Sequence, residues 1–176
     1  MSGEIVSSQI VFKGQVLTVR IDTVKFADGK TTEREIVGYG DAVAVVAIDS
    51  TGSVLLVKQY RHAAGMELLE IPAGGIEPGE RPEQAAAREM REETGFLPAS
   101  IMPLGGFYSA PGYSTEFLHL FLARDLVPSP LVAEDTGDII LVRVPLSQVS
   151  GLIKNGTIRD GKSVAGLLSY LCLKPD

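Results

Sequence analysis

The pattern of hydrophobic and polar residues predicts short strands, a central helix and two closing helices. Residues 42–48, AVAVVAI, form a continuous apolar run, which is typical of a strand buried on both faces. The turn DSTG separates this run from a second one, SVLLVKQYR at 53–61, so the two predict a hairpin. Upstream, short β-branched runs flank Asp28-Gly29, a common hairpin turn, and indicate a β-rich N-terminal segment.

The remaining pattern mixes strands with helices. A short strand is expected at 66–74, ending at Pro72, and a helix is expected from about Pro82 to Thr94, with Gly95 at its C-terminal cap. The other expected elements are strands at 101–110, 116–126 and 138–146 and helices at 146–156 and 162–174. This order predicts an α+β domain in which helices cover a mixed sheet.

Composition narrows the class of protein. The 176 residues are 45% hydrophobic and 22% charged, which suits one domain with a real core. The net charge of −6 and the lack of a Lys/Arg block argue against nucleic-acid binding, so an anionic ligand would need a metal ion or placed arginines. No apolar run approaches the roughly 18 residues that span a membrane, and the single cysteine, Cys172, fits a reducing compartment. We therefore expect a cytoplasmic protein without membrane partners.

Three carboxylates crowd one part of the expected helix. At about 100° per residue, Glu89, Glu92 and Glu93 lie within one turn and border its buried face. Such crowding is costly unless a positive charge neutralises it. Arg88, four residues before Glu92, is one candidate, and a hard divalent cation is the other. Because charge runs are usually solvated surface, spacing alone leaves the salt-bridged reading open.

The residues around this helix resemble a known motif. Gly74, Glu80 and REMREETGF at 88–96 match a complete Nudix box, G-x5-E-x7-R-E-U-x-E-E-x-G-U, in which U is a bulky apolar residue. The segments LLEIPAGGIEPGE at 68–80 and SAPGYSTEF at 109–117 are similar to the ADP-ribose pyrophosphatase branch of that family. The second segment departs from the branch at Ala110, where serine is usual.

This resemblance implies a fold and a reaction. The fold would be the Nudix α/β/α sandwich with a mixed β-sheet, at 41–176, preceded by a small β-rich extension at 1–40 that dimerises the protein. The expected reaction is Mg²⁺-dependent hydrolysis of the diphosphate of ADP-ribose to AMP and ribose 5-phosphate, with Mn²⁺ as a substitute metal. The expected partners are a nucleoside diphosphate sugar and a second copy of the chain.

The resemblance also assigns roles to individual residues. The metal ligands would be the backbone carbonyl of Ala73 and the side chains of Glu89, Glu92 and Glu93. Arg88 would orient these glutamates and, with Glu92, take part in catalysis, while Glu80 and Gly95 would shape the motif. The expected substrate contacts are Arg34, Arg61, Gly74 and Pro111. Surface salt bridges remain the alternative for both arginines.

Two questions stay open from the sequence. The general base would be Glu116, on the loop that begins at Pro111, or a member of the acidic cluster Glu134, Asp135 and Asp138. The substrate could instead be another nucleoside diphosphate sugar such as GDP-mannose, because the box acts on the diphosphate alone. A non-catalytic sensor of nucleotide sugars is a further alternative, although all three box glutamates are present.

Overall fold

The computed structural model describes residues 3–132 and 138–173, and the chain divides into two compact units. The first unit comprises residues 1–41 and 108–117, and the second comprises residues 42–107 and 118–176. The segment 108–117 thus belongs with the N-terminal strands, although about seventy residues separate them in sequence.

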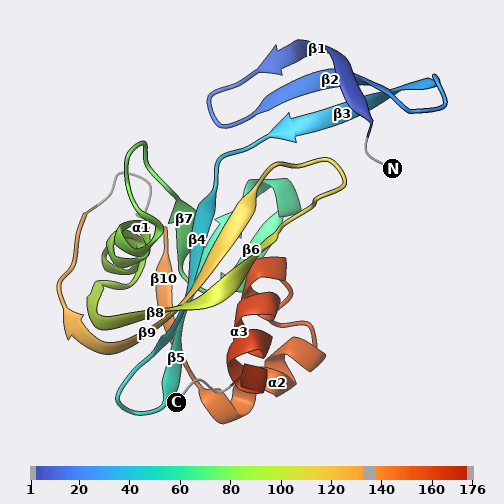
Figure 1. Ribbon diagram of the computed structural model, residues 1–176. Helices are drawn as coiled ribbons and strands as arrows, with labels where there is room; N and C mark the ends of the chain where they lie inside the picture. Colours follow the sequence, from blue (N-terminus) through green and yellow to red (C-terminus); the bar gives the residue numbers. More distant parts are fainter. Residues whose placement is uncertain (1–2, 133–137, 174–176) are drawn as a thin grey trace. The chain divides into compact units, whose positions relative to one another are not determined.

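The first unit is an antiparallel sheet with one added loop (Figure 1). Its strands follow the order β1 (Glu4–Lys13), β2 (Thr18–Lys25), β3 (Thr31–Gly38). The β2–β3 hairpin turns at Gly29, whose φ of +83° costs glycine little, so the predicted Asp28-Gly29 turn is confirmed. The loop joins β3 through two backbone bonds, from Val37 N–H to the Tyr113 carbonyl (2.7 Å) and from Thr115 N–H to the Val37 carbonyl (3.0 Å).

The second unit is built on a mixed sheet with the strand order β10-β5-β4-β9-β8, in which β6 also pairs with β5 and β7 with β4. Strand β4 runs parallel to β9 and antiparallel to β5 and β7. The strands are β4 (Ala42–Ile48), β5 (Ser53–Arg61), β6 (Met66–Glu70), β7 (Ala73–Gly75), β8 (Phe96–Tyr108), β9 (Phe117–Pro128) and β10 (Ile140–Pro145).

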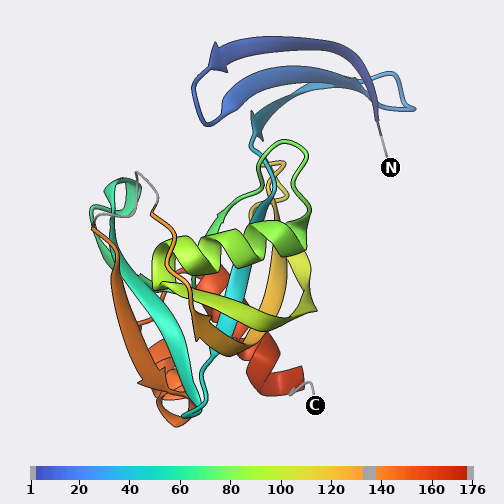
Figure 2. The same cartoon turned by 90° about the vertical axis from the view of Figure 1, so that its left-hand side faces the viewer.

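Helices cover both faces of this sheet, so the predicted α/β/α sandwich with a mixed sheet is confirmed (Figures 1 and 2). One face carries α1 (Pro82–Glu89) and its continuation η2 (Met90–Thr94), and the other carries α2 (Leu146–Lys154) and α3 (Gly161–Leu173). A short turn, η1 (His62–Ala64), follows β5. In the described ranges, none of the helices has the length and apolar character needed to cross a membrane.

Strand β4 supplies both hydrophobic cores. Alternate side chains, such as Ala44 and Val46, pack in the core that α2 and α3 cover, while Val43 and Val45 pack in the core that α1 covers. All seven residues are buried, which explains why the segment lacks polar alternation. Full burial of each valine contributes about 1.5–3 kcal/mol to stability.

Two predicted elements differ from the structure. The strand expected at 66–74 is split into β6 and β7, because Pro72 has no N–H to donate; its carbonyl instead accepts from Val45 N–H at 2.9 Å. The single helix expected over 82–94 is α-helical only to Glu89 and then widens into a π-helical turn, η2. The predicted cap at Gly95 is confirmed, with φ +79° and an N–H bond to the Arg91 carbonyl.

Candidate active site

Glu93 lies against strand β7. Its Oε2 accepts a hydrogen bond from Ala73 N–H at 3.0 Å. Burial raises the pKa of the Glu93 carboxyl to about 7 and the charge of Glu89 adds to this rise, whereas the Ala73 bond and the charges of Arg61 and Lys162 oppose it. The nearby positive charges therefore compensate the Glu93 carboxylate only in part near neutral pH.

Arg88 gathers three carboxylates around one guanidinium. It bonds both oxygens of Glu80 at 3.0 Å, and its Nη1 reaches Glu89 at 2.6 Å and Glu92 at 3.0 Å. A further bond joins Nη2 to the Gly75 carbonyl at 2.8 Å. The bonds to Glu80, followed by those to Glu89, raise the pKa of Arg88. The pairing with Glu92 predicted from spacing is confirmed, and the Arg88 side chain is only 19% exposed.

Glu89 lies directly against the backbone of Gly74. A Cβ at position 74 would overlap the Glu89 carboxyl group, so glycine is required for this close approach. Glu89 is 8% exposed, and burial raises its pKa even though Arg88 bonds to it. The first glycine of the matched motif therefore makes room for one of its glutamates.

The π-helical turn η2 separates the directions of the two last glutamates. Glu92 turns back to Arg88, while its neighbour Glu93 reaches Ala73 on β7. In a π-turn the backbone bonds span five residues instead of four, which widens the helix locally and often marks functional sites. Register at 3.6 residues per turn therefore mispositions the side chains of this segment.

Glu89 and Glu93 are the carboxylates best placed to hold a divalent cation. Burial raises the pKa of both carboxyl groups; the charge of Glu89 adds to the rise at Glu93, and the charges of Glu92 and Glu80 add to the rise at Glu89. Within the described residues, no three His, Cys, Asp or Glu side chains gather into a site that could hold a metal ion. A donor set of two carboxylates suits Mg²⁺, which usually takes one or two of them together with substrate phosphates.

A second charged cluster, which the sequence did not predict, is centred on Glu70. Glu70 is 1% exposed and accepts two bonds from Arg61, at 2.8 and 2.6 Å. Lys162 also donates to Glu70, and it bonds Asp160 at 2.9 Å. Arg61 was predicted as a substrate contact, but the cluster was missed because Lys162 lies 92 residues from Glu70. The sequence signal was an acid, Glu70, between the apolar residues Leu69 and Ile71.

Other predicted site residues belong to the first unit. Arg34 lies on β3, where its register partner is Asp22 on β2. Pro111 helps to line a cavity of about 440 Å³ with Tyr108 and Tyr113, and Glu116 donates its N–H to the Ser114 hydroxyl at 3.2 Å. Of the acidic cluster, Glu134 and Asp135 lie outside the described residues, and Asp138 is in an exposed turn before β10.

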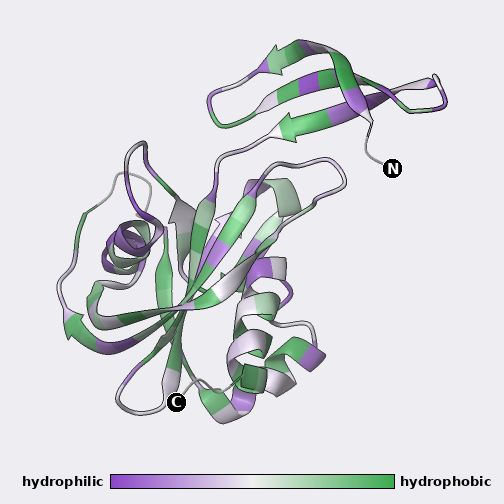
Figure 3. Ribbon diagram, in the orientation of Figure 1, coloured by the Kyte–Doolittle hydropathy of each residue, from purple (hydrophilic) through white to green (hydrophobic). Residues whose placement is uncertain are grey.

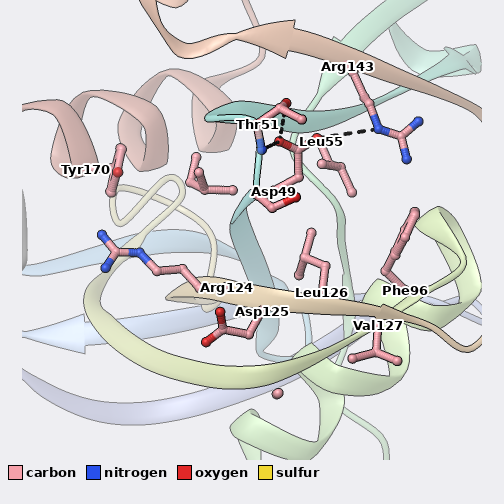
Figure 4. Close-up of a pocket in the computed structure, with 13 residues that line it drawn as sticks. Asp49, Thr51, Leu55, Phe96, Arg124, Asp125, Leu126, Val127, Arg143 and Tyr170 are labelled. Atoms are coloured by element: carbon pink, nitrogen blue, oxygen red, sulfur yellow. Dashed lines mark hydrogen bonds and ion pairs between the residues drawn. The ribbon is translucent and has the colours of Figure 1, made fainter.

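A larger cavity of about 710 Å³ in the second unit is separate from these residues (Figure 4). The Arg143 guanidinium lies 5.4 Å from the centre of the Phe96 ring and 3.5 Å from the Asp49 carboxylate at its edge. Arg124 and Tyr170 also line it. None of the predicted catalytic, metal or substrate residues lines this cavity.

Comparison with known proteins adds independent findings. A family model described as NUDIX domain matches residues 38–167. The chain is 33% identical over 171 residues to the ADP-ribose pyrophosphatase of Bacillus subtilis (strain 168), covering 96% of this chain and 92% of that one. It is 33% identical over 160 residues to the GDP-mannose pyrophosphatase of Citrobacter koseri, covering 85% and 82%. A crystal structure of an ADP compounds hydrolase superposes with a TM-score of 0.90 at 24% identity, over 98% of this chain and 94% of that one.

Proposed function

Since the chain belongs to the NUDIX domain family and is a Nudix hydrolase, we propose that it cleaves the diphosphate of ADP-ribose to AMP and ribose 5-phosphate with Mg²⁺. The observation that carries this proposal is the pair of partly buried carboxylates, Glu89 and Glu93, packed against β7. The similarity to an ADP-ribose pyrophosphatase over nearly the whole of both chains supports the choice of substrate.

The donor set fits the metal ion. Glu89 and Glu93, with the Ala73 carbonyl and support from Glu92, would hold Mg²⁺ beside the diphosphate. When bound, the metal ion neutralises phosphate oxygens and lowers the pKa of a coordinated water. Burial raises the pKa of both carboxyl groups, and a bound cation would oppose this rise by stabilising their charged forms.

The arginines are proposed to orient the glutamates and to bind the substrate. Arg88 donates to Glu80, Glu89, Glu92 and Gly75, so its proposed role is to hold the glutamates in position. Arg61 uses the Nε and Nη2 atoms of its guanidinium on Glu70, and it is proposed to offer the remaining N–H groups to a phosphate. Arg34, Gly74 and Pro111 are proposed as further substrate contacts.

A panel of nucleoside diphosphate derivatives tests the substrate. With Mg²⁺ present, we expect ADP-ribose to be cleaved with the highest kcat/KM, measured as phosphate released by a coupled phosphatase. Consumption of GDP-mannose with ADP-ribose left intact would favour the alternative, which the Citrobacter koseri relative supports. Cleavage of neither would favour a non-catalytic sensor.

The general base is a separate proposal within the same assay. Glu116 is our candidate, because a carboxylate on a loop can accept a proton from an attacking water. We expect Glu116→Gln to lower kcat by about 10²-fold, within the usual range for general-base catalysis. The control is Glu33→Gln on β3, an exposed acid of the same unit, and equal activity of both variants would remove Glu116 from this role.

We also propose that the protein is a homodimer formed through β1. All ten residues of this edge strand are exposed, among them Ile10 (62%) and Phe12 (55%), and its hydrophobic stretches are visible in Figure 3. An apolar edge strand of this length invites pairing with another chain. Light scattering after gel filtration should give a dimer that Ile10→Asp/Phe12→Asp converts to monomer, whereas Val132→Asp, at a 95% exposed position, leaves the mass unchanged. A wild-type monomer would contradict the proposal.

A further inference from the structure

The Glu70 cluster contains a half-buried cation, Lys162, that the proposed reaction does not use. We propose that Lys162 is a positioning residue: together with Glu70 it fixes the guanidinium of Arg61 so that the free edge of that group binds a phosphate of the substrate. This inference rests on the proposed function, because it assumes that Arg61 contacts an anionic substrate.

Glu70 fixes the orientation of the Arg61 guanidinium. Its Nε and Nη2 atoms bond the two oxygens of Glu70 in a bidentate pair, which fixes the plane and the rotation of the guanidinium. The Arg61 side chain nevertheless remains 40% exposed. One edge is therefore held by protein, and the other edge keeps donors for a ligand.

Glu70 is buried and is paired with two cations. Its side chain is 1% exposed, so a single cation would leave part of its charge poorly compensated in the protein interior. Lys162 supplies the second cation and donates to Oε2, the oxygen that also accepts from Arg61 Nη2. Burial would raise the pKa of Glu70, but Arg61 and Lys162 together hold it below its ordinary value, so the carboxylate stays ionised.

Lys162 is held in place by Asp160 at the start of α3. Asp160 accepts a bond from Lys162 at 2.9 Å and bonds from the N–H and hydroxyl of Ser163 at 3.1 and 2.6 Å. The fully buried Ser163 hydroxyl in turn accepts from Ile71 N–H at 2.8 Å. The start of α3 is thus joined to the residue after Glu70, so Lys162 and Glu70 are fixed to each other by a second, independent contact.

The Glu70 cluster lies next to the segment that contacts Glu93. Glu70, which accepts from Arg61, is three residues before Ala73, and Ala73 N–H donates to the Glu93 carboxylate at 3.0 Å. Arg61 therefore lies close to the proposed metal ligands, where the diphosphate must bind. Lys162 is more enclosed, with a side chain 14% exposed, and both of its described partners are carboxylates, so it acts through Glu70.

A double-mutant cycle tests the chain from Lys162 to Arg61. We expect Lys162→Met to raise KM for ADP-ribose about 10-fold, the usual scale for loss of a supporting group, with kcat changed by less than about 3-fold. In an Arg61→Met background the same change should alter KM by less than about 2-fold, because the residue it positions is gone. Lys162→Arg should recover part of the lost affinity, and Lys154→Met, at an exposed site on α2, should change nothing.

Two further measurements complete the test. Glu70→Gln should reproduce the KM effect, which covers the case that Lys162→Met folds poorly. Calorimetry with ADP-ribose in EDTA measures affinity without turnover and should show the same losses. If wild-type protein neither binds nor cleaves ADP-ribose, the proposed function fails. If wild type does both, and the effects of Lys162→Met and Arg61→Met simply multiply, Lys162 has no positioning role.

Discussion

Glu93→Gln is expected to lower kcat for ADP-ribose hydrolysis by about 10²–10³-fold, the scale at which loss of one group that stabilises transition-state charge is usually felt. The substitution removes a charge proposed to hold Mg²⁺ but keeps the shape of the side chain and an oxygen that can accept from Ala73 N–H. Steady-state kinetics with Mg²⁺ measure the effect, and Glu83→Gln, an exposed acid on the same helix, is the matched control.

The same variant should not be less stable than wild type. The folded pKa of Glu93, about 7, lies above its ordinary value of 4.5. Ionising this acid therefore costs stability as pH rises through that interval, and the uncharged glutamine avoids the cost. Urea unfolding at pH 7.5 in EDTA should give a free energy of unfolding equal to or above the wild-type value. Near-full turnover of Glu93→Gln would contradict the assignment of Glu93 as a metal ligand. A loss of stability would mean that the lower activity comes from damage to the fold.

Arg88→Met should produce the largest loss of stability among the site variants. It leaves Glu80, Glu89 and Glu92 with no cation between them, and all three side chains are at most 15% exposed. Removing one partner of a buried ion pair costs about 3–5 kcal/mol, and residual solvent screening reduces our expectation to about 2–4 kcal/mol. Arg88→Lys should recover only part, because one ammonium cannot match the forked contacts to Glu80.

Urea unfolding in EDTA provides the measurement, and Arg91→Met is the control. Arg91 lies three residues further along the same helix, and its side chain donates one bond to the Ser129 carbonyl at 3.1 Å. Its loss should cost at most about 1.5 kcal/mol. If Arg88→Met and Arg91→Met destabilise the protein equally, the guanidinium does not organise the glutamates.

Much of the fold was predictable because its signals are local. The AVAVVAI run is the strand β4, the DSTG turn precedes β5, and Gly95 caps the helix that bears Glu89 and Glu93, since each depends on a few adjacent residues. The attachment of the 108–117 loop to β3 was not predictable, because its backbone bonds join Val37 to Tyr113 and Thr115 across more than seventy positions. Backbone pairing of this kind leaves no periodic mark in sequence.

The candidate site was likewise predictable only in part. The motif places Glu89 and Glu93 on one helix, but nothing in the sequence indicates that Met90–Thr94 widens into a π-turn, so regular register could not give the directions of Glu92 and Glu93. The Glu70 cluster was missed for a different reason. Its members come from β5, β6 and the start of α3, and only the folded sheet brings them together.

The two-sided burial of β4 has a consequence for how the second unit comes apart. Because one strand contributes alternate residues to both cores, neither layer of helices can detach and expose its side of the sheet while the other stays intact without disturbing that strand. The layers are therefore expected to unfold as a single cooperative unit, with the amides of β4 among the last to exchange with solvent. A destabilising change under α3 should thus loosen the helix that bears Glu89 and Glu93 as well, at a distance and without touching it.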